Sequence, residues 1–157
     1  MCLALYSASQ AGVTVQLNVR GLCCLRPGVK GVSDNLEVVS IVDRFLEHTR
    51  CFYFRNGGHE EIYFSSADWM TRNLDKRLEI LFPVHDPYLR RRALEELRVY
   101  FSDNVKAFRL RPDSSWQRKI GRVKRIRAQQ ELHDRALDAH RLVQQKAPQF
   151  RPLTRPE

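Results

Sequence analysis

The apolar residues of the chain recur with helical spacing in some segments and with strand spacing in others. A helical pattern begins at the first residue and ends at Gly12. Its apolar members are Leu3, Leu5, Ala8 and Ala11. The next segment, 13–19, alternates as a strand. No capping residue precedes the helix, so the sequence begins inside an element, which suggests a fragment or a truncated gene.

The middle of the chain predicts a loop, a buried strand and a hairpin. Residues 19–35 contain the glycines and prolines of a loop, which α/β proteins often use for ligand contacts. Residues 38–48 are apolar enough for a buried strand that passes into a short helical turn. The β-rich runs CFYF and EIYF then flank an Asn-Gly-Gly turn, which is a good hairpin signal. A hairpin centred on this turn places Arg50 close to Ser65 and His48 near Ala67.

The second half of the chain continues the alternation. Residues 77–84 predict another buried strand, and Asp86 can cap a helix over 87–101. Residues 105–111 predict a last short strand, and 128–145 a helix with a thin apolar stripe. This order of helices and strands predicts an α/β or α+β fold.

The net charge of the chain indicates a class of partner. The 157 residues include 27 Lys and Arg against 18 Asp and Glu, a formal net charge of +9. Such an excess favours an anionic partner, such as a phosphate-rich metabolite, a nucleic acid or a membrane surface. Between 109 and 127 the basic residues far outnumber the acids, and we expect a solvated or polyanion-facing surface there.

The cysteines and the N-terminus indicate a compartment. No apolar run is long enough for a membrane-spanning helix, and the first segment lacks the cationic start of a signal peptide. The four cysteines show no disulfide framework and no repeated metal-binding pair. We therefore expect a cytoplasmic protein with no structural metal site; peripheral association with a membrane stays open.

Polar side chains suited to phosphoryl chemistry gather around the predicted hairpin. They are His48, Arg50, Ser65 or Ser66, Asp68 and Asn73. An imidazole can be a nucleophile or a proton donor, a guanidinium binds phosphate oxygens, and hydroxyls donate hydrogen bonds. On these residues alone a structural role is the simpler interpretation, because a histidine near a hairpin is often only a satisfied polar group and the SSAD run can cap a turn.

Several longer strings carry a resemblance. His48-Thr49-Arg50 followed by SSAD resembles a variant of the H-x-K and G-S-x-N pattern of the phospholipase D-like fold. The strings ASQAGV, VRGLCCLRPGV, SIVDRFLEH, FYF-NGG and SSADWMTRNLD are similar, in order and spacing, to the final part of the long-type polyphosphate kinases. The resemblance covers Leu3 to Arg111 and, beyond that, only IRAQ at 126–129.

The resemblance implies a fold and a domain organisation. We expect a phospholipase D-like half-domain over 1–111, with a mixed β-sheet flanked by helices and truncated at its N-terminal side. Residues 112–157 would form a basic extension that is partly helical, with a disordered end at 146–157.

The resemblance also implies a reaction. The family transfers the γ-phosphoryl group of ATP reversibly to inorganic polyphosphate, with Mg²⁺, through a phosphohistidine. The phosphorylated histidine and the Mg²⁺ ligands would lie in an earlier subdomain whose sequence is absent here. His48 matches the family's second histidine, and Arg20 matches its nucleotide-contacting arginine. The resemblance implies lining or supporting roles for residues in the matching motifs: Arg50, Ser66, Asp68, Arg72 and Asn73.

Three functions follow as hypotheses. In the first, the chain is the second-histidine half of a polyphosphate kinase site, inactive without the remaining kinase domains or an oligomer. In the second, it is a non-catalytic module that binds polyphosphate or nucleotide through Arg20 and the basic run. In the third, it is a phospholipase D-like hydrolase that acts as a homodimer; Arg50 stands where that chemistry normally has lysine, which disfavours this hypothesis.

Overall fold

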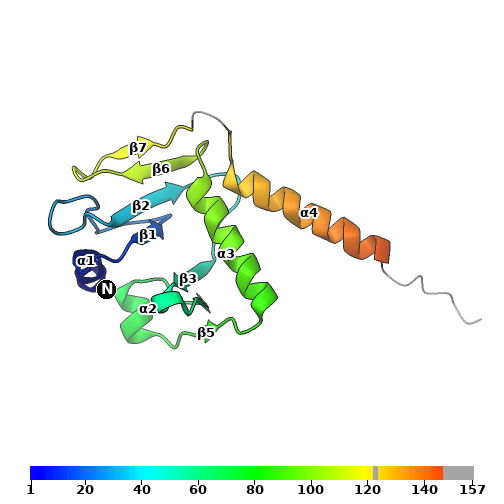
Figure 1. The fold of residues 1–157 in the computed structure, drawn as a ribbon, viewed down its shortest axis with the longest axis horizontal. Helices are drawn as coiled ribbons and strands as arrows, with labels where there is room; N and C mark the ends of the chain where they lie inside the picture. Colours follow the sequence, from blue (N-terminus) through cyan, green and yellow to red (C-terminus); the bar gives the residue numbers. More distant parts are fainter. Residues whose placement is uncertain (122–123, 147–157) are drawn as a thin grey trace, which may run out of the picture.

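The computed structural model describes residues 1–121 and 124–146 (Figure 1). The helices are α1 Cys2–Gln10, α2 Thr71–Lys76, α3 Pro87–Ser102 and α4 Ala128–Lys146, with the 3-10 turn η1 at Asn56–Gly58. The strands are β1 Val15–Asn18, β2 Leu36–Ile41, β3 Arg50–Phe54, β4 Glu61–Ser65, β5 Leu81–Pro83, β6 Ala107–Leu110 and β7 Trp116–Arg118.

The four-stranded sheet contains most of the core and runs in the order β1-β2-β6-β7. β1 is parallel to β2, whereas β6 and β7 are antiparallel to their neighbours. Alternate residues of β2 point to opposite faces of the sheet. Leu36 and Val38 share a core with residues of α1, while Ile41 packs with Val99 of α3 and Ala128 of α4. The sheet is therefore mixed and flanked by helices, which confirms the predicted fold class.

The three-stranded sheet has the order β3-β4-β5 and is built on the predicted hairpin. Arg50 pairs with Ser65, as the turn predicted. Gly57 and Gly58 have φ angles of 64° and 105°, in the left-handed region that glycine enters without a Cβ clash. His48 lies before β3 in a segment without regular structure, so it is not part of the ladder.

Three local predictions were wrong. The chain after β2 runs to β3 without the expected helical turn. The apolar run 77–84 forms β5 at the sheet edge but is not buried: Leu78 is fully exposed and Leu81 is 60% exposed. Residues 105–111 contain the predicted strand, β6, but it is not the last one, because β7 follows and pairs with it. The short helix α2 was not predicted.

Two aspartates fix the ends of the long helices. Asp86 accepts a hydrogen bond from the backbone N–H of Leu89 at 2.8 Å, which confirms the predicted cap of α3. Asp103, which is fully buried, accepts the backbone N–H of Ala128 at 2.7 Å and so ties the end of α3 to the start of α4. Figure 1 shows α3 running from the smaller sheet to the larger one, and α4 extending away from both.

Residues after 111 pair and pack with residues before them. Trp116 of β7 pairs with Leu110 of β6, and Ala128 contributes to the core. The division of the chain into 1–111 and 112–157 remains a prediction. The expected disordered end falls, from residue 147 onward, outside the described residues.

Candidate functional site

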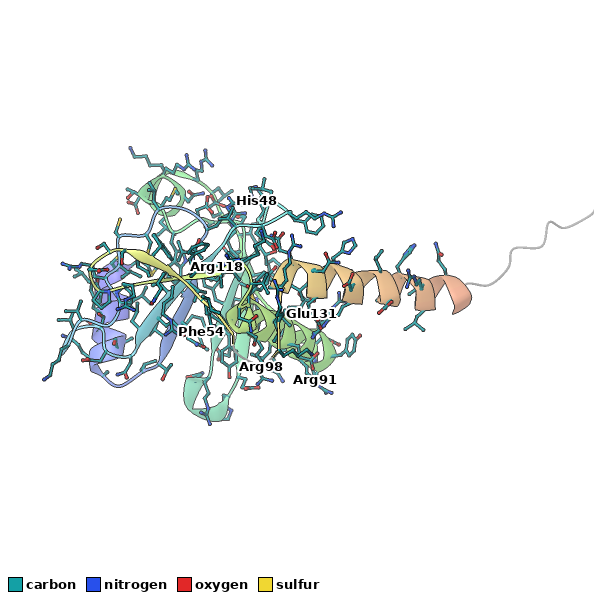
Figure 2. The ribbon with its side chains drawn as sticks, turned by 90° about the horizontal axis from the view of Figure 1, so that it is seen from above. His48, Phe54, Arg91, Arg98, Arg118 and Glu131 are labelled. Atoms are coloured by element: carbon teal, nitrogen blue, oxygen red, sulfur yellow. The ribbon has the colours of Figure 1, made fainter. Side chains whose placement is uncertain are left out.

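Arg20 and His48 follow two neighbouring strands. Because β1 and β2 are parallel and adjacent, their carboxyl ends meet at one edge of the larger sheet. Arg20 lies just past the end of β1, and its guanidinium donates a hydrogen bond to the carbonyl oxygen of Glu47. His48 is the next residue; it is exposed and lies near the start of α4 (Figure 2). The sheet topology therefore brings these two predicted site residues together.

Arg50 connects the histidine segment to the hairpin. Its Nη1 donates to the carbonyl oxygen of His48 at 2.8 Å. Its Nε and Nη2 both donate to Oδ1 of Asp68, at 3.0 and 2.8 Å. The side chains of Arg50 and Asp68 are 25% and 36% exposed, so water still reaches this ion pair. Arg50 thus fixes the backbone of His48 relative to the loop that follows β4.

The arginine group consists of Arg50, which contacts Asp68, and of Arg72 and Arg20, whose charges act on it. Hydrogen bonds from Arg50 hold the pKa of Asp68 below its usual value, and the charges of Arg72 and Arg20 lower it further. The charges of three guanidinium groups thus act on one carboxylate, and the surface around it carries excess positive charge. Arg20 and Arg72 are exposed to solvent, where they can meet an anion. Arginine groups in this arrangement suit phosphate oxygens.

Ser66 and Asn73 form a second, adjacent group around Glu79. Ser66 Oγ donates to Glu79, and Asn73 Nδ2 donates to Glu79 Oε1 at 2.7 Å. These hydrogen bonds lower the pKa of Glu79, and the charge of Arg50 also contributes. Asn73 is 4% exposed, and its Oδ1 has no hydrogen-bond partner within the described structure. Both residues therefore shape the loop wall, with their polar hydrogens committed to a carboxylate.

Glu79 was missed by the sequence analysis, although a signal for it exists. It is the lone acid within the apolar run 77–84. A charged residue in such a run needs a partner. The side chains that partner it, Ser66 and Asn73, were themselves predicted site residues.

The basic run at 109–127 is largely engaged within the protein. Five of its members donate to acceptors within the protein: Arg109 to Glu37, Arg111 to Gln117, Arg118 to the carbonyl of Val105, Lys119 to that of Phe101, and Arg127 to Asp43. Arg127 binds Asp43 with two contacts of 2.7 Å. The described part of the run therefore has in good part a structural role.

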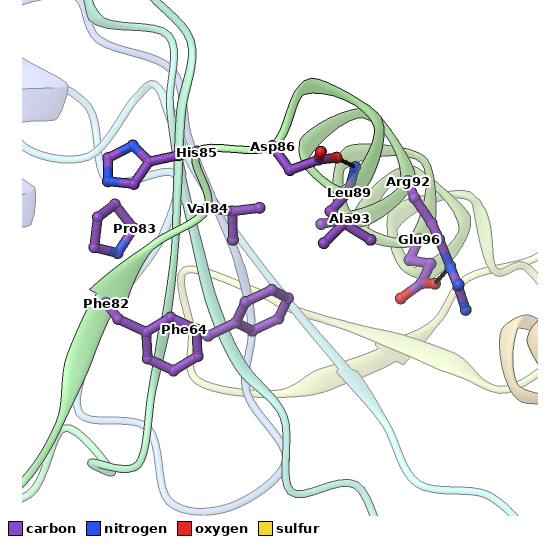
Figure 3. Close-up of a pocket in the computed structure, with 10 residues that line it drawn as sticks. All are labelled: Phe64, Phe82, Pro83, Val84, His85, Asp86, Leu89, Arg92, Ala93 and Glu96. Atoms are coloured by element: carbon purple, nitrogen blue, oxygen red, sulfur yellow. Dashed lines mark hydrogen bonds and ion pairs between the residues drawn. The ribbon is translucent and has the colours of Figure 1, made fainter.

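A hollow of about 410 Å³ opens between β5 and α3 (Figure 3). Its lining includes Phe64, Phe82, Val84 and Leu89, with His85 at the rim of the same group. None of the predicted site residues lines it. The lining also includes the charged residues Asp86, Arg92 and Glu96, so the hollow is mixed in character, and it is separate from the arginine group.

Metal and membrane features were searched over 1–121 and 124–146. Within these ranges no three His, Cys, Asp or Glu side chains gather closely enough to hold a metal ion. No helix there is both long and apolar enough to cross a bilayer. The four cysteines are free thiols.

Comparisons with known proteins extend this picture. The family described as "Polyphosphate kinase C-terminal domain 2" matches residues 1–130. A polyphosphate kinase of Rhodopirellula baltica is 55% identical over 148 residues, which cover 93% of this chain and 17% of that protein. A polyphosphate kinase of Pseudomonas putida is 60% identical over 115 residues, or 73% of this chain and 16% of that protein. The crystal structure of a polyphosphate kinase from Porphyromonas gingivalis superposes with a TM-score of 0.83 at 42% identity.

The fold and the arginine–histidine edge define a phospholipase D-like α/β domain, as the structural match supports. The chain belongs to the polyphosphate kinase C-terminal domain 2 family. It spans 17% of the Rhodopirellula protein and 21% of the Porphyromonas chain. The family match runs without a break past Arg111 to the first turn of α4 and so includes the IRAQ string at 126–129.

Proposed function

We propose that this chain supplies the second-histidine half of the ATP and polyphosphate site of a polyphosphate kinase. The whole enzyme transfers the γ-phosphoryl group of ATP reversibly to inorganic polyphosphate through a phosphohistidine. The observation that carries the proposal is an exposed histidine whose segment is bonded by Arg20 and Arg50, with the charges of Arg20 and Arg72 acting on the carboxylate that Arg50 binds. The identity to polyphosphate kinases supports it.

Charge stabilisation is the main task of such a site. Phosphoryl transfer depends on positioning and on neutralising phosphate oxygens. Arg20 binds the phosphates of ATP or polyphosphate with its planar guanidinium, while its contact with Glu47 fixes its direction. Arg72 adds charge from α2, and Asp68 orients Arg50.

His48 has a different task. An exposed imidazole can donate a hydrogen bond to a phosphate oxygen and a proton to a leaving group. The backbone of His48 is held by Arg50, so the ring is presented from a fixed point. Ser66 and Asn73 line the adjacent wall, where each donates a hydrogen bond to Glu79.

Magnesium enters this scheme with ATP. The carboxylates near the proposed site are already engaged: Asp68 by Arg50 and Glu79 by Ser66 and Asn73. The charges of three arginines also act on Asp68, which disfavours a cation there. The residues of this chain therefore do not fit a magnesium site of their own, and we expect the protein ligands of the ion in the rest of the enzyme.

The chain by itself is proposed to be inactive. The phosphorylated histidine belongs to the earlier subdomain of the family, and a half-set of catalytic groups loses most of the rate. The partners are then the remaining kinase domains, as part of an oligomer or of one longer chain. The exposed apolar residues of 69–82 support such a partner, since surfaces of this kind usually mark interaction sites. They are Trp69, Met70, Leu74, Leu78, Ile80, Leu81 and Phe82. The free thiols fit a cytoplasmic enzyme.

A non-catalytic binding module is the second candidate. The observation that favours it is the exposed arginine group, which can hold polyphosphate without any histidine chemistry. Binding of this kind survives His48→Ala and falls steeply as salt rises.

The test is a titration of the purified chain with MgATP and with inorganic polyphosphate, alongside a phosphate-transfer assay. Arg20→Ala and His48→Ala are compared with the wild type, and Arg91→Ala on the exposed side of α3 serves as the charge-matched control. We expect saturable binding that both site variants weaken about tenfold or more, equivalent to about 1.4 kcal/mol, without turnover. If both variants bind with the affinity of the wild type, the proposed function is contradicted.

A further inference from the structure

We propose that Gln129, in the first turn of α4, is a positioning residue for the proposed phosphate site. It holds the segment from Phe45 to Glu47, and through that segment it sets the positions of Arg20 and His48. This inference rests on the proposed function. Gln129 touches neither a substrate nor a reacting atom; it acts only through the backbone of the segment.

The contacts of Gln129 form a two-way clamp on Phe45. The backbone N–H of Phe45 donates to Gln129 Oε1 at 2.6 Å, and Gln129 Nε2 donates to the carbonyl oxygen of Phe45 at 2.8 Å. A side-chain amide here replaces the partner strand that this segment lacks. Gln129 is 3% exposed and both bonds are partly buried, so losing the amide leaves the N–H and carbonyl of Phe45 without their protein partner.

The clamp continues to the proposed site through Glu47. Gln129 Nε2 also donates to Glu47 Oε1 at 3.1 Å. Burial, together with a hydrogen bond to Glu47, raises the pKa of Tyr100 well above its usual value, so the Tyr100 hydroxyl stays protonated and able to donate. The carbonyl oxygen of Glu47 accepts from Arg20. The side chain of Glu47 is thus held by Tyr100 of α3 and Gln129 of α4, and its backbone carbonyl oxygen is held by Arg20, the proposed phosphate ligand.

The segment depends on this clamp because no regular structure supports it. Residues 46–49 lie in neither a helix nor a strand, and a loop with few backbone hydrogen bonds opens easily. The clamp itself is anchored. Ala128, beside Gln129, is fully buried and bonded to Asp103, and Arg127 binds Asp43. The start of α4 is therefore a fixed support for the histidine segment.

The first variant removes the amide and keeps the size of the side chain. Gln129→Met in the full 157-residue chain is compared with Gln144→Met, which changes an exposed glutamine on the same helix. We expect amide hydrogen exchange at Phe45 to accelerate at least tenfold while amides of β2 stay protected. We also expect affinity for inorganic polyphosphate to fall by about tenfold, with Gln144→Met unchanged in both measurements.

A second variant gives a pH profile. Gln129→Glu places a carboxyl in the same space, and this group can donate to the carbonyl of Phe45 only when protonated. Polyphosphate affinity of Gln129→Glu should therefore approach that of the wild type at acidic pH and fall as the introduced carboxyl ionises, relative to the wild-type profile. If Gln129→Met fails to fold, this profile still decides the question.

The outcomes separate this inference from the proposed function. Faster exchange at Phe45 with unchanged polyphosphate affinity, or a Gln129→Glu profile parallel to the wild type, overturns the positioning role alone. If Arg20→Ala and His48→Ala both bind polyphosphate with the affinity of the wild type, both proposals are overturned.

Discussion

The two sheets of the molecule differ in how completely they bury their apolar residues. In the four-stranded sheet Val38 and Val39 are fully buried and Ile41 is 2% exposed. In the three-stranded sheet Ile62 is 1% exposed, yet Leu81 is 60% and Phe82 51% exposed. The larger sheet is closed on both faces by helices of this chain. The smaller sheet, which contributes Arg50 and the Asp68 loop to the proposed site, has an apolar edge that residues 1–121 and 124–146 leave exposed.

This difference indicates that the two sheets have different roles. The larger sheet holds the domain together and brings Arg20 and His48 to one edge. The smaller sheet adds Arg50 and the Asp68 loop, and it leaves Leu81 and Phe82 exposed at its edge. Substitutions in the two regions should therefore have opposite consequences for folding and for assembly.

The largest expected effect is on folding. Val39→Asp places an unpaired charge in the closed core and should unfold the domain, at a cost of several kcal/mol. Leu78→Asp makes a comparable exchange on the smaller sheet's side, where the side chain is fully exposed, and should change stability by about 0.5 kcal/mol or less. Urea unfolding followed by circular dichroism measures both. Equal destabilisation would remove the contrast between the sheets.

Asp103 gives the next largest effect. Its Oδ1 accepts backbone N–H groups of Val105, Lys106 and Ala107, and its Oδ2 accepts that of Ala128. Asp103→Asn keeps the shape but replaces one acceptor with a donor, so buried N–H groups lose their partner. We expect a loss of at least about 2 kcal/mol in urea unfolding. The exposed Asp138→Asn, on the outer part of α4, is the matched control and should be neutral.

Two ion pairs, Arg127–Asp43 and Arg50–Asp68, extend the comparison to the dependence of stability on pH. Hydrogen bonds from Arg127 hold the pKa of Asp43 below its usual value, and the Asp43 side chain is 2% exposed. Asp43→Asn should cost about 1.5–3 kcal/mol at pH 7. Asp68→Asn, at the more exposed pair, should cost about 0–1 kcal/mol.

The pH dependence has a definite sign. A lowered carboxyl pKa stabilises the fold at pH values above the unfolded pKa of about 3.9, and this stabilisation is lost as pH falls through the folded pKa. The stability difference between wild type and Asp43→Asn should therefore shrink between pH 5 and pH 2. A difference that stays constant over that range would contradict the assigned role of Arg127.

The smallest effect is on thiol reactivity in the smaller sheet. Burial raises the pKa of Cys51 in β3 to about 11, while Cys24 is exposed in the loop after β1. Since the thiolate is the reactive form, iodoacetamide at pH 8 should label Cys24 well before Cys51. Mass spectrometry of timed samples measures the order, and early labelling of Cys51 would show that β3 opens in solution.

Local signals explain which parts of the structure were predictable from the sequence. The Asn-Gly-Gly turn gave the register of Arg50 opposite Ser65, and Asp86 before Pro87 gave the start of α3. These features depend on a few neighbouring residues. The motif strings also named the residues that gather around Asp68.

The remaining features depend on contacts distant in sequence. The run 77–84 is apolar enough for burial, but whether it is covered depends on a surface far away in sequence or on another polypeptide. Gln129 and Phe45 are 84 residues apart, and no periodicity links them. Glu79 was recognisable only as the lone acid in an apolar run. Long-range polar contacts of this kind are the part of the site that required the structure.

The most direct test of the central claim is a chimeric enzyme. The matching 148-residue stretch of the Rhodopirellula baltica polyphosphate kinase is replaced with this chain, with and without His48→Ala. We predict that the chimera synthesises polyphosphate from MgATP, that His48→Ala lowers the rate by about 10²–10³, and that the 157-residue chain alone makes none. An active chimera indifferent to His48→Ala, or polyphosphate synthesis by the isolated chain, would contradict the claim that this domain is the second-histidine half of a kinase site.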